Sequence, residues 1–226
     1  MNSVIRFDAW LTGKLSGHQA LATPEVRGLL ILIEWAIHGV PWIVGALVII
    51  AISPEQPKRS FAFNLLIALL FDCGAVAVIK HSVLRQRPPT YTADMLFTTK
   101  TDHYSFPSGH TSRAVMLAII GCWSRAVLND NWTFKGEFSA IQRPDWLFLQ
   151  WNVEFSDWIV VIVAGTVVGL SRIMLGRHYV TDVIGGVGLG IGEGIICTQV
   201  LWLSNDNTRA INSFVKAAVP WLAWND

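Results

Sequence analysis

Long apolar stretches alternate with shorter polar segments along the chain. Five of the apolar stretches are close to the length of about 20 residues that a helix needs to cross a bilayer. They run over Leu29–Ile52, Phe61–Ile79, His110–Val127, Trp158–Leu175 and Val183–Leu203. The pattern predicts an all-α fold, a multi-span membrane helix bundle with about five transmembrane helices.

The order of the crossings decides which polar segments share a membrane face. The second stretch ends at Lys80, the third begins at His110, the fourth ends near Arg172 and the fifth begins beside Asp182. Successive spans alternate in direction, so these four points lie on one face together with the N-terminus. The segment 128–157 and the C-terminus lie on the opposite face. Three polar clusters that are distant in sequence are therefore expected to meet at one membrane surface.

No internal repeat or disordered tract divides the chain, so we predict one membrane-embedded domain over residues 1–226. Residues 1–27 lack the apolar core of a signal peptide, and the first span is expected to act as its own insertion signal. Their mixture of apolar and charged positions suits either an interfacial segment or a plain capping helix. Residues 128–157, which are polar with interleaved tryptophans, are predicted to form a loop on the face opposite the polar clusters.

The composition supports a bilayer as the solvent. Hydrophobic residues make up 52% of the chain and charged residues only 15%, whereas a soluble domain carries about 25% charged residues. The 11 tryptophans suit membrane interfaces, and a net charge of +1 without a basic run gives no support for nucleic-acid binding. Cys73, Cys122 and Cys197 are odd in number and form no C-x-x-C pair, so we predict neither disulfides nor a cysteine metal site.

The first polar cluster contains three cations after the second stretch. Lys80 precedes Arg87-Pro88 by seven residues, and Arg85 lies between them. Because Lys and Arg often anchor the ends of membrane spans, a cationic helix end is the plainer interpretation. The alternative is fixed positive charge for an anionic ligand.

The second cluster, Ser105–His110, stands at the entrance to a predicted helix. Serine and proline at this place can simply cap the helix. A helix N-terminus also offers free N–H groups and the positive end of a dipole, which suit an anion. Gly109 would let the anion approach the backbone, and His110 is placed to transfer a proton.

The third cluster combines Ser171-Arg172 with His178 and Asp182. A histidine and an aspartate four residues apart share one face of a helix, so the carboxylate can fix the tautomer of the imidazole. A structural hydrogen bond or half of a metal site explains the pair equally well. Taken together, however, the clusters offer the three cations Lys80, Arg87 and Arg172 with two histidines. Several cations at one site are unfavourable unless an anion neutralises them, and phosphoryl transfer needs such an array.

These three clusters resemble the signature motifs of the type 2 phosphatidic acid phosphatase superfamily in order, spacing and placement. No signature position departs from the pattern. The surrounding residues, including Met174-Leu175-Gly176 and the segment from Glu34 to Trp42, are similar to the polyisoprenoid (presqualene) diphosphate phosphatase branch. The similarity covers most of residues 7–204, apart from the segment 128–157, which is longer than expected.

The resemblance implies a role for each signature residue. His178 would attack phosphorus to form a phosphohistidine, oriented by Asp182, and His110 would protonate the leaving group and later activate water. The residues implied to bind the phosphoryl oxygens are Lys80, Arg87, Ser108, Gly109 and Arg172. The family uses no metal, so no cofactor is expected, and few carboxylates surround the motifs.

Three ionisable residues lie within the predicted spans, where such a residue is a functional hypothesis by default. For Glu34, a hydrogen bond to His38 one turn later is favoured over contact with a lipid head group. Asp72, two turns before Lys80, either pairs with a motif cation or is structural. The role of Glu193 is left open.

Two further features admit alternatives. The glycine-rich run Gly185–Gly192 does not match a nucleotide-binding fingerprint and follows no strand, so close helix packing is the favoured interpretation. Arg85 and Arg113 either extend the phosphate site or meet lipid phosphates.

The sequence therefore predicts a phosphohydrolase acting on polyisoprenoid diphosphates and related lipid phosphates. The alternatives are a broad-specificity phosphatidate or sphingoid phosphate phosphatase and, from another class, a non-catalytic membrane scaffold. Its partners would be the lipid substrate and membrane lipids. Lys and Arg are spread over both faces, so the positive-inside rule does not orient the protein. The branch resemblance implies the endoplasmic reticulum and nuclear envelope.

Overall fold

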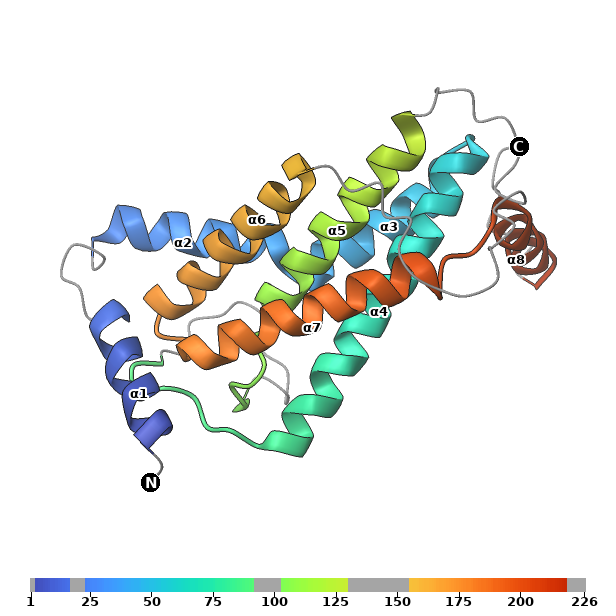
Figure 1. The fold of residues 1–226 in the computed structure, drawn as a ribbon. Helices are drawn as coiled ribbons and strands as arrows, with labels where there is room; N and C mark the ends of the chain where they lie inside the picture. Colours follow the sequence, from blue (N-terminus) through green and yellow to red (C-terminus); the bar gives the residue numbers. More distant parts are fainter. Residues whose placement is uncertain (1–2, 17–22, 92–102, 130–154, 219–226) are drawn as a thin grey trace.

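The structure is a computed structural model, and it describes residues 3–16, 23–91, 103–129 and 155–218. The predicted loop 128–157 lies almost wholly outside these residues. Within the described part of the chain the regular structure is helical, and a single isolated bridge joins Gln86 to Tyr104. The helices are α1 (Ser3–Ser16), α2 (Pro24–Ile37), α3 (Gly39–Ile52), α4 (Gln56–Val83), α5 (Gly109–Asn129), α6 (Phe155–Met174), α7 (Val180–Gln199) and α8 (Asn205–Ala218). Figure 1 shows them packed as one bundle, which confirms the predicted all-α class.

The first predicted span is broken into two helices at His38. This residue has an extended backbone (φ −63°, ψ 137°), and its Nδ1 accepts the N–H of Val40 at 3.3 Å, which caps α3. Pro41 follows in the first turn of α3, where its missing N–H is tolerated. The axes of α2 and α3 are bent by 41°, so the prediction of one continuous helix over Leu29–Ile52 is wrong. The two helices together are still long and apolar enough to form one span.

α5 differs from the other predicted spans because its polar side chains face the protein. By length and hydropathy, three described helices can cross a membrane (α4, α6 and α7), or four if α2 and α3 count as one span. α5 is not among them, and Thr111, Ser112 and Arg113 are among the polar residues that lower its hydropathy. All three are buried, and α5 packs against α2, α4, α6 and α7. A helix with protein around it does not need an apolar circumference. The predicted count of five is therefore reached only with this shielded helix.

The glycine-rich run in α7 allows close packing against α5. Gly186, Gly190 and Gly194 recur every four residues on one face of α7. A Cβ atom at Gly186 would lie 2.6 Å from the carbonyl oxygen of Ser108, and one at Gly190 would clash with the carbonyl oxygen of Ser112. The interpretation of this run as a helix-packing surface is confirmed.

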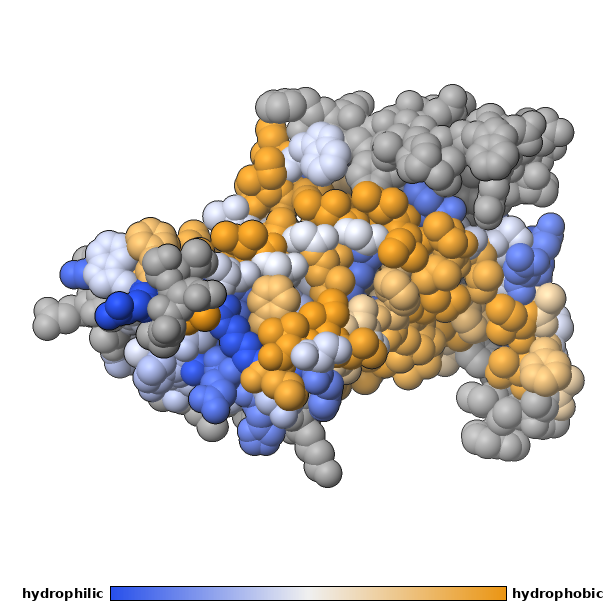
Figure 2. Space-filling view, turned by 60° about the horizontal axis from the view of Figure 1, so that its bottom comes forward, coloured by the Kyte–Doolittle hydropathy of each residue, from blue (hydrophilic) through white to orange (hydrophobic). Residues whose placement is uncertain are grey.

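The outer surface of the bundle is apolar. Large hydrophobic side chains such as Leu32, Ile162 and Ile184 are exposed on α2, α6 and α7. Figure 2 shows hydrophobic residues forming a broad band over the bundle, while hydrophilic residues gather toward one end. An exposed apolar area of this extent is typical of a surface that faces lipid. Cys73, Cys122 and Cys197 are free thiols.

The two ends of the bundle are built by different segments. α8 is held to the beginning of α4 by a short contact between the hydroxyls of Ser60 and Thr208 (2.5 Å). The side chain of Asn64 also accepts the N–H of Leu203 at 2.7 Å. α1 lies at the other end, beside the beginning of α7 (Figure 1). The N-terminal and C-terminal helices therefore lie at opposite ends of the bundle, as the alternation of spans predicts.

Candidate active site

Backbone hydrogen bonds join the three predicted motif clusters at the α1 end of the bundle. The N–H of Ser105 donates to the carbonyl of Arg85 at 2.8 Å, which links the second cluster to the first. The N–H of Ser108 donates to the carbonyl of Asp182 at 3.0 Å, which links the second cluster to the third. The predicted convergence of the clusters is therefore observed, and Ser105–Ser108 is the segment that connects them.

His178 is buried in the short loop before α7, with 1% of its surface exposed. Its Nδ1 lies 2.8 Å from the carbonyl oxygen of Ser105. Because a carbonyl oxygen only accepts hydrogen bonds, Nδ1 is assigned the proton and Nε2 keeps its lone pair. This tautomer leaves Nε2 as the nucleophilic atom of the ring.

Asp182 supports His178 less directly than the sequence suggests. α7 begins at Val180, so His178 and Asp182 do not share a helix face. The carboxylate oxygen Oδ2 lies 3.6 Å from His178 Nδ1 and accepts the N–H of Tyr179 at 2.8 Å. The other oxygen, Oδ1, accepts a hydrogen bond from Arg85 at 2.7 Å. The carbonyl of Ser105 therefore orients the imidazole, and Asp182 supplies a nearby negative charge.

The surroundings of His178 keep its imidazole neutral. Burial lowers the pKa of His178 well below its usual value of 6.5, and the nearby positive charges of Arg87, Arg172 and Lys80 lower it further. The hydrogen bond to Ser105 acts in the opposite direction but is the smaller effect. A neutral imidazole at neutral pH is the form that can attack an electrophile.

His110 lies in the first turn of α5, and its buried Nε2 has no hydrogen-bond partner among the described residues. Its ring centroid is 5.7 Å from that of His38, at the break between α2 and α3. An unpartnered buried nitrogen is unfavourable unless a ligand or water satisfies it. This observation fits the predicted role of His110 in proton transfer.

The backbone of the second cluster is used differently from the prediction. Ser108 donates its N–H to Asp182, and its hydroxyl lies 2.9 Å from that of Thr111. The Ser108 amide is therefore already occupied, and the first-turn N–H groups from Gly109 onward are the donors left for an anion. A Cβ atom on Gly109 would lie 3.2 Å from Val76 on α4, so close helix packing also requires a small residue here.

Three predicted phosphate-binding cations lie around these histidines. Lys80 and Arg172 are buried, with 4% and 0% of their surfaces exposed, and Arg87 is half-buried. Arg87 donates to the carbonyl of Arg177 at 2.9 Å and stacks on the ring of Tyr91 at 4.5 Å. Nη1 of Arg172 lies 2.9 Å from Oε1 of Glu34, while Nε and Nη2 have no hydrogen-bond partner among the described residues. Buried donors of this kind suit an oxyanion.

The sequence did not predict the pairing of two carboxylates with arginines at this end. Glu34, for which a hydrogen bond with His38 was favoured, forms ion pairs with Arg172 and Arg177. Its position within a span was the signal that marked it. Arg85 binds Asp8 of α1 at 2.6 Å as well as Asp182, and it therefore holds α1 against the third cluster. No signal in the sequence singled out Asp8.

Other buried ionisable residues lie deeper in the bundle. Arg113 donates to Asp72 at 2.5 Å, and Ser112 donates to Glu193 at 2.5 Å. Asp72 therefore pairs with Arg113 rather than with a signature cation, and Arg113 faces the bundle interior rather than lipid phosphates. In the described part of the chain, no three His, Cys, Asp or Glu side chains are grouped so that they could hold a metal ion.

Comparison with known proteins identifies the family. Residues 61–206 match the model of the PAP2 superfamily. The chain is 36% identical over 155 residues to a probable lipid phosphate phosphatase beta of Arabidopsis thaliana, covering 65% of this chain and 68% of the relative. It is 26% identical over 193 residues to an undecaprenyl-diphosphatase of Sulfolobus acidocaldarius, covering 83% of this chain and 75% of that protein.

A solved structure has the same fold. The crystal structure of a transmembrane PAP2 type phosphatidylglycerolphosphate phosphatase from Bacillus subtilis aligns with a TM-score of 0.56 and 21% identity, covering 88% of this chain and 86% of that one. The family match spans all three motif clusters, which the fold brings together at one end of a membrane bundle. The chain thus belongs to the PAP2 superfamily and is a membrane-embedded phosphatase.

Proposed function

We propose that this protein is a metal-independent phosphohydrolase that removes phosphate from polyisoprenoid diphosphates and related lipid phosphates through a phosphohistidine intermediate. The observation that carries the proposal is the environment of His178. Its Nδ1 is held by the carbonyl of Ser105, while burial and surrounding cations favour the neutral ring. Nε2 is thereby left as a nucleophile within a cationic site.

In the proposed first step, Nε2 of His178 forms a bond to phosphorus as the bond between phosphorus and the leaving oxygen breaks. His110 donates a proton to that oxygen. Lys80, Arg87, Arg172 and the first-turn amides of α5 stabilise the charge on the phosphoryl oxygens. In the second step His110 takes a proton from water, the water oxygen attacks phosphorus, and inorganic phosphate leaves as His178 regains its lone pair.

The names of the relatives bear on the lipid tail. They include an undecaprenyl-diphosphatase and a decaprenylphosphoryl-5-phosphoribose phosphatase, both named for isoprenoid lipids. A phosphatidylglycerophosphatase B of Bacillus subtilis is 30% identical over 133 residues, which favours glycerolipid phosphates as the second candidate class. The resemblance around Glu34 and Met174 supports the isoprenoid class as the first.

A substrate panel on the purified protein tests this proposal. Phosphate release would be measured in defined micelles with farnesyl diphosphate, presqualene diphosphate, phosphatidate and sphingosine phosphate. We expect the highest kcat/KM for the two isoprenoid diphosphates and no turnover by His178→Gln. A preference for phosphatidate would replace the isoprenoid assignment with the broad-specificity one. Unchanged turnover by His178→Gln would contradict the mechanism.

We also propose that the protein resides in the endoplasmic reticulum and nuclear envelope, with the site facing the cytosol. α1 and α8 lie at opposite ends of the bundle, so a tag after Asp226 would then face the lumen. We expect such a tag to resist protease in sealed microsomes. Digestion of the tag in intact vesicles would show that the protein has the opposite orientation.

A further inference from the structure

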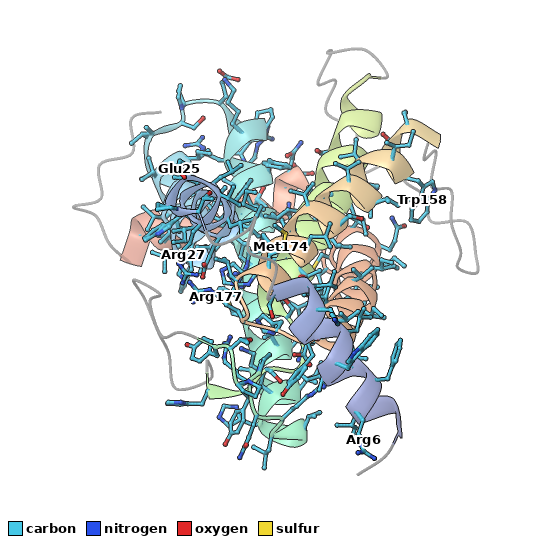
Figure 3. All side chains as sticks on the ribbon, turned by 90° about the vertical axis from the view of Figure 1, so that its left-hand side faces the viewer. Arg6, Glu25, Arg27, Trp158, Met174 and Arg177 are labelled. Atoms are coloured by element: carbon cyan, nitrogen blue, oxygen red, sulfur yellow. The ribbon has the colours of Figure 1, made fainter. Side chains whose placement is uncertain are left out.

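Glu34 brings a negative charge into the group of cations that the proposed mechanism uses. It lies on α2, one turn before the break at His38, and only 5% of its surface is exposed. Its Oε1 is 2.9 Å from Nη1 of Arg172, and its Oε2 is 3.0 Å from Nη2 of Arg177. Figure 3 shows Arg177 below Arg27 of α2 and below Met174 at the end of α6.

Arg172 and Arg177 are both buried, with 0% and 1% of their surfaces exposed. Buried charges of like sign raise each other's free energy, and a carboxylate that pairs with both offsets part of that cost. Arg177 is also tied to the signature residue Arg87, whose Nη1 donates to the Arg177 carbonyl at 2.9 Å. Glu34 therefore neutralises part of a cluster that continues into the phosphate-binding residues.

The ion pair engages one nitrogen of the Arg172 guanidinium group. Nη1 lies 2.9 Å from Oε1 of Glu34, while Nε and Nη2 form no hydrogen bond among the described residues. The carboxylate therefore balances the charge of the guanidinium group, while the N–H groups of Nε and Nη2 stay available to a ligand. A phosphoryl group that accepts those hydrogen bonds comes close to a carboxylate of the same sign of charge.

We propose that Glu34 is a built-in counter-anion of the phosphate site. It holds Arg172 and Arg177 in place when the site is empty, and it weakens the hold of the site on inorganic phosphate so that the product leaves. The inference rests on the proposed function, because it assumes that Arg172 binds the phosphoryl group. Glu34 touches neither substrate nor reacting atoms in this account and is a positioning residue.

Glu34→Gln tests the charge while keeping the shape of the side chain. Orthophosphate and vanadate should bind about tenfold more tightly to the variant, since one like charge near the ligand is removed. The kcat and KM for the lipid substrate should fall together as product release slows. Glu34→Asp keeps the charge and should stay closer to the wild type. Orthophosphate binding that is unchanged or weaker in Glu34→Gln would overturn the proposal.

Two controls make the result specific. Glu25→Gln removes the same charge from an exposed position in the first turn of α2, and phosphate binding should not change. Arg177→Gln removes a cation and leaves Glu34 shared with Arg172 alone, so orthophosphate should bind about tenfold more weakly. Unchanged phosphate binding in Arg177→Gln would also overturn the proposal, and this variant decides the matter if Glu34→Gln does not fold.

Binding would be followed by ³¹P NMR line broadening of orthophosphate, which requires no turnover. If the wild type fails to release phosphate from every lipid in the panel, the proposed function fails. If the wild type is active but the Glu34 and Arg177 variants bind orthophosphate like the wild type, only the counter-anion proposal fails.

Discussion

Gly186 lies where α7 packs against the backbone of the second motif cluster. A Cβ atom at this position would be 2.6 Å from the carbonyl oxygen of Ser108 and 3.1 Å from Cβ of Thr111. The Ser108 carbonyl cannot move freely, because it accepts the N–H of Ser112 at 3.0 Å in the first turn of α5. Gly186→Ala should therefore push α7 away from α5.

The size of this displacement follows from the distances. Ordinary van der Waals contact begins at 3.4 Å, so the oxygen and the new methyl group must separate by 0.8 Å (3.4 − 2.6). Overpacking of this kind costs about 1–3 kcal/mol of stability. Asp182, one turn before Gly186, accepts the Ser108 N–H, so the displacement also strains the link between two motif clusters. Misplacement of about 1 Å at a reacting centre lowers the rate by about 10²-fold, and we expect a loss of kcat/KM approaching that.

Gly188→Ala is the matched control, because nothing lies within 4 Å of a Cβ atom at Gly188. In an exposed helical position this change removes the glycine penalty and should stabilise the protein by about 1 kcal/mol. Thermal unfolding in detergent and phosphate release would be measured for both variants. If Gly186→Ala is as stable and as active as Gly188→Ala, the tight packing of α7 on Ser108 is refuted.

Four further predictions concern the active-site histidines and the need for a metal. The pKa of His178 is lowered in the folded protein, so the unfolded state binds more protons below pH 6.5. The free energy of unfolding should therefore fall as the pH drops below 6.5, which chemical unfolding at several pH values would measure. His178→Gln should show a smaller fall. Phosphoenzyme formation in rapid-quench experiments should remain fast at pH 6.5, where a histidine with the ordinary pKa would be half-protonated. Activity should survive excess EDTA and be inhibited by vanadate, and loss on chelation that Mg²⁺ restores would contradict the mechanism. His110→Ala should slow the first step far more for lipid monophosphates than for diphosphates, because an alkoxide leaving group needs a proton more than a phosphate leaving group does. Equal losses of the first-step rate in rapid-quench assays would indicate that His110 is a phosphate ligand instead.

The sequence by itself determined the class of fold and the meeting of the three motif clusters. Apolar stretches of near-spanning length leave few arrangements in a bilayer, because every backbone polar group must be satisfied within the helix. Their alternation places Lys80, His110, Arg172 and His178 on one face, and the structure joins their segments there. The glycine spacing in α7 likewise predicted close packing, since a missing side chain matters only where another backbone approaches.

Only the tertiary structure decided which groups pair with one another. Spacing along a chain shows which residues are neighbours on a helix. Whether two groups on separate elements form a hydrogen bond depends on differences of a few tenths of an ångström in the distance between them. His178 is held by the Ser105 carbonyl 73 residues away rather than by Asp182 on a shared helix face, because α7 begins two residues after His178.

The sequence did not predict the pairing of Glu34 with two buried arginines, for the same reason. Its neighbours in sequence suggested His38, but Glu34 forms ion pairs with Arg172 at the end of α6 and with Arg177 in the loop beyond. A buried charge is unfavourable without an opposite charge nearby, and the packing between helices decides which residue supplies it. The sequence identified the chemical groups, and the three-dimensional packing assigned their partners.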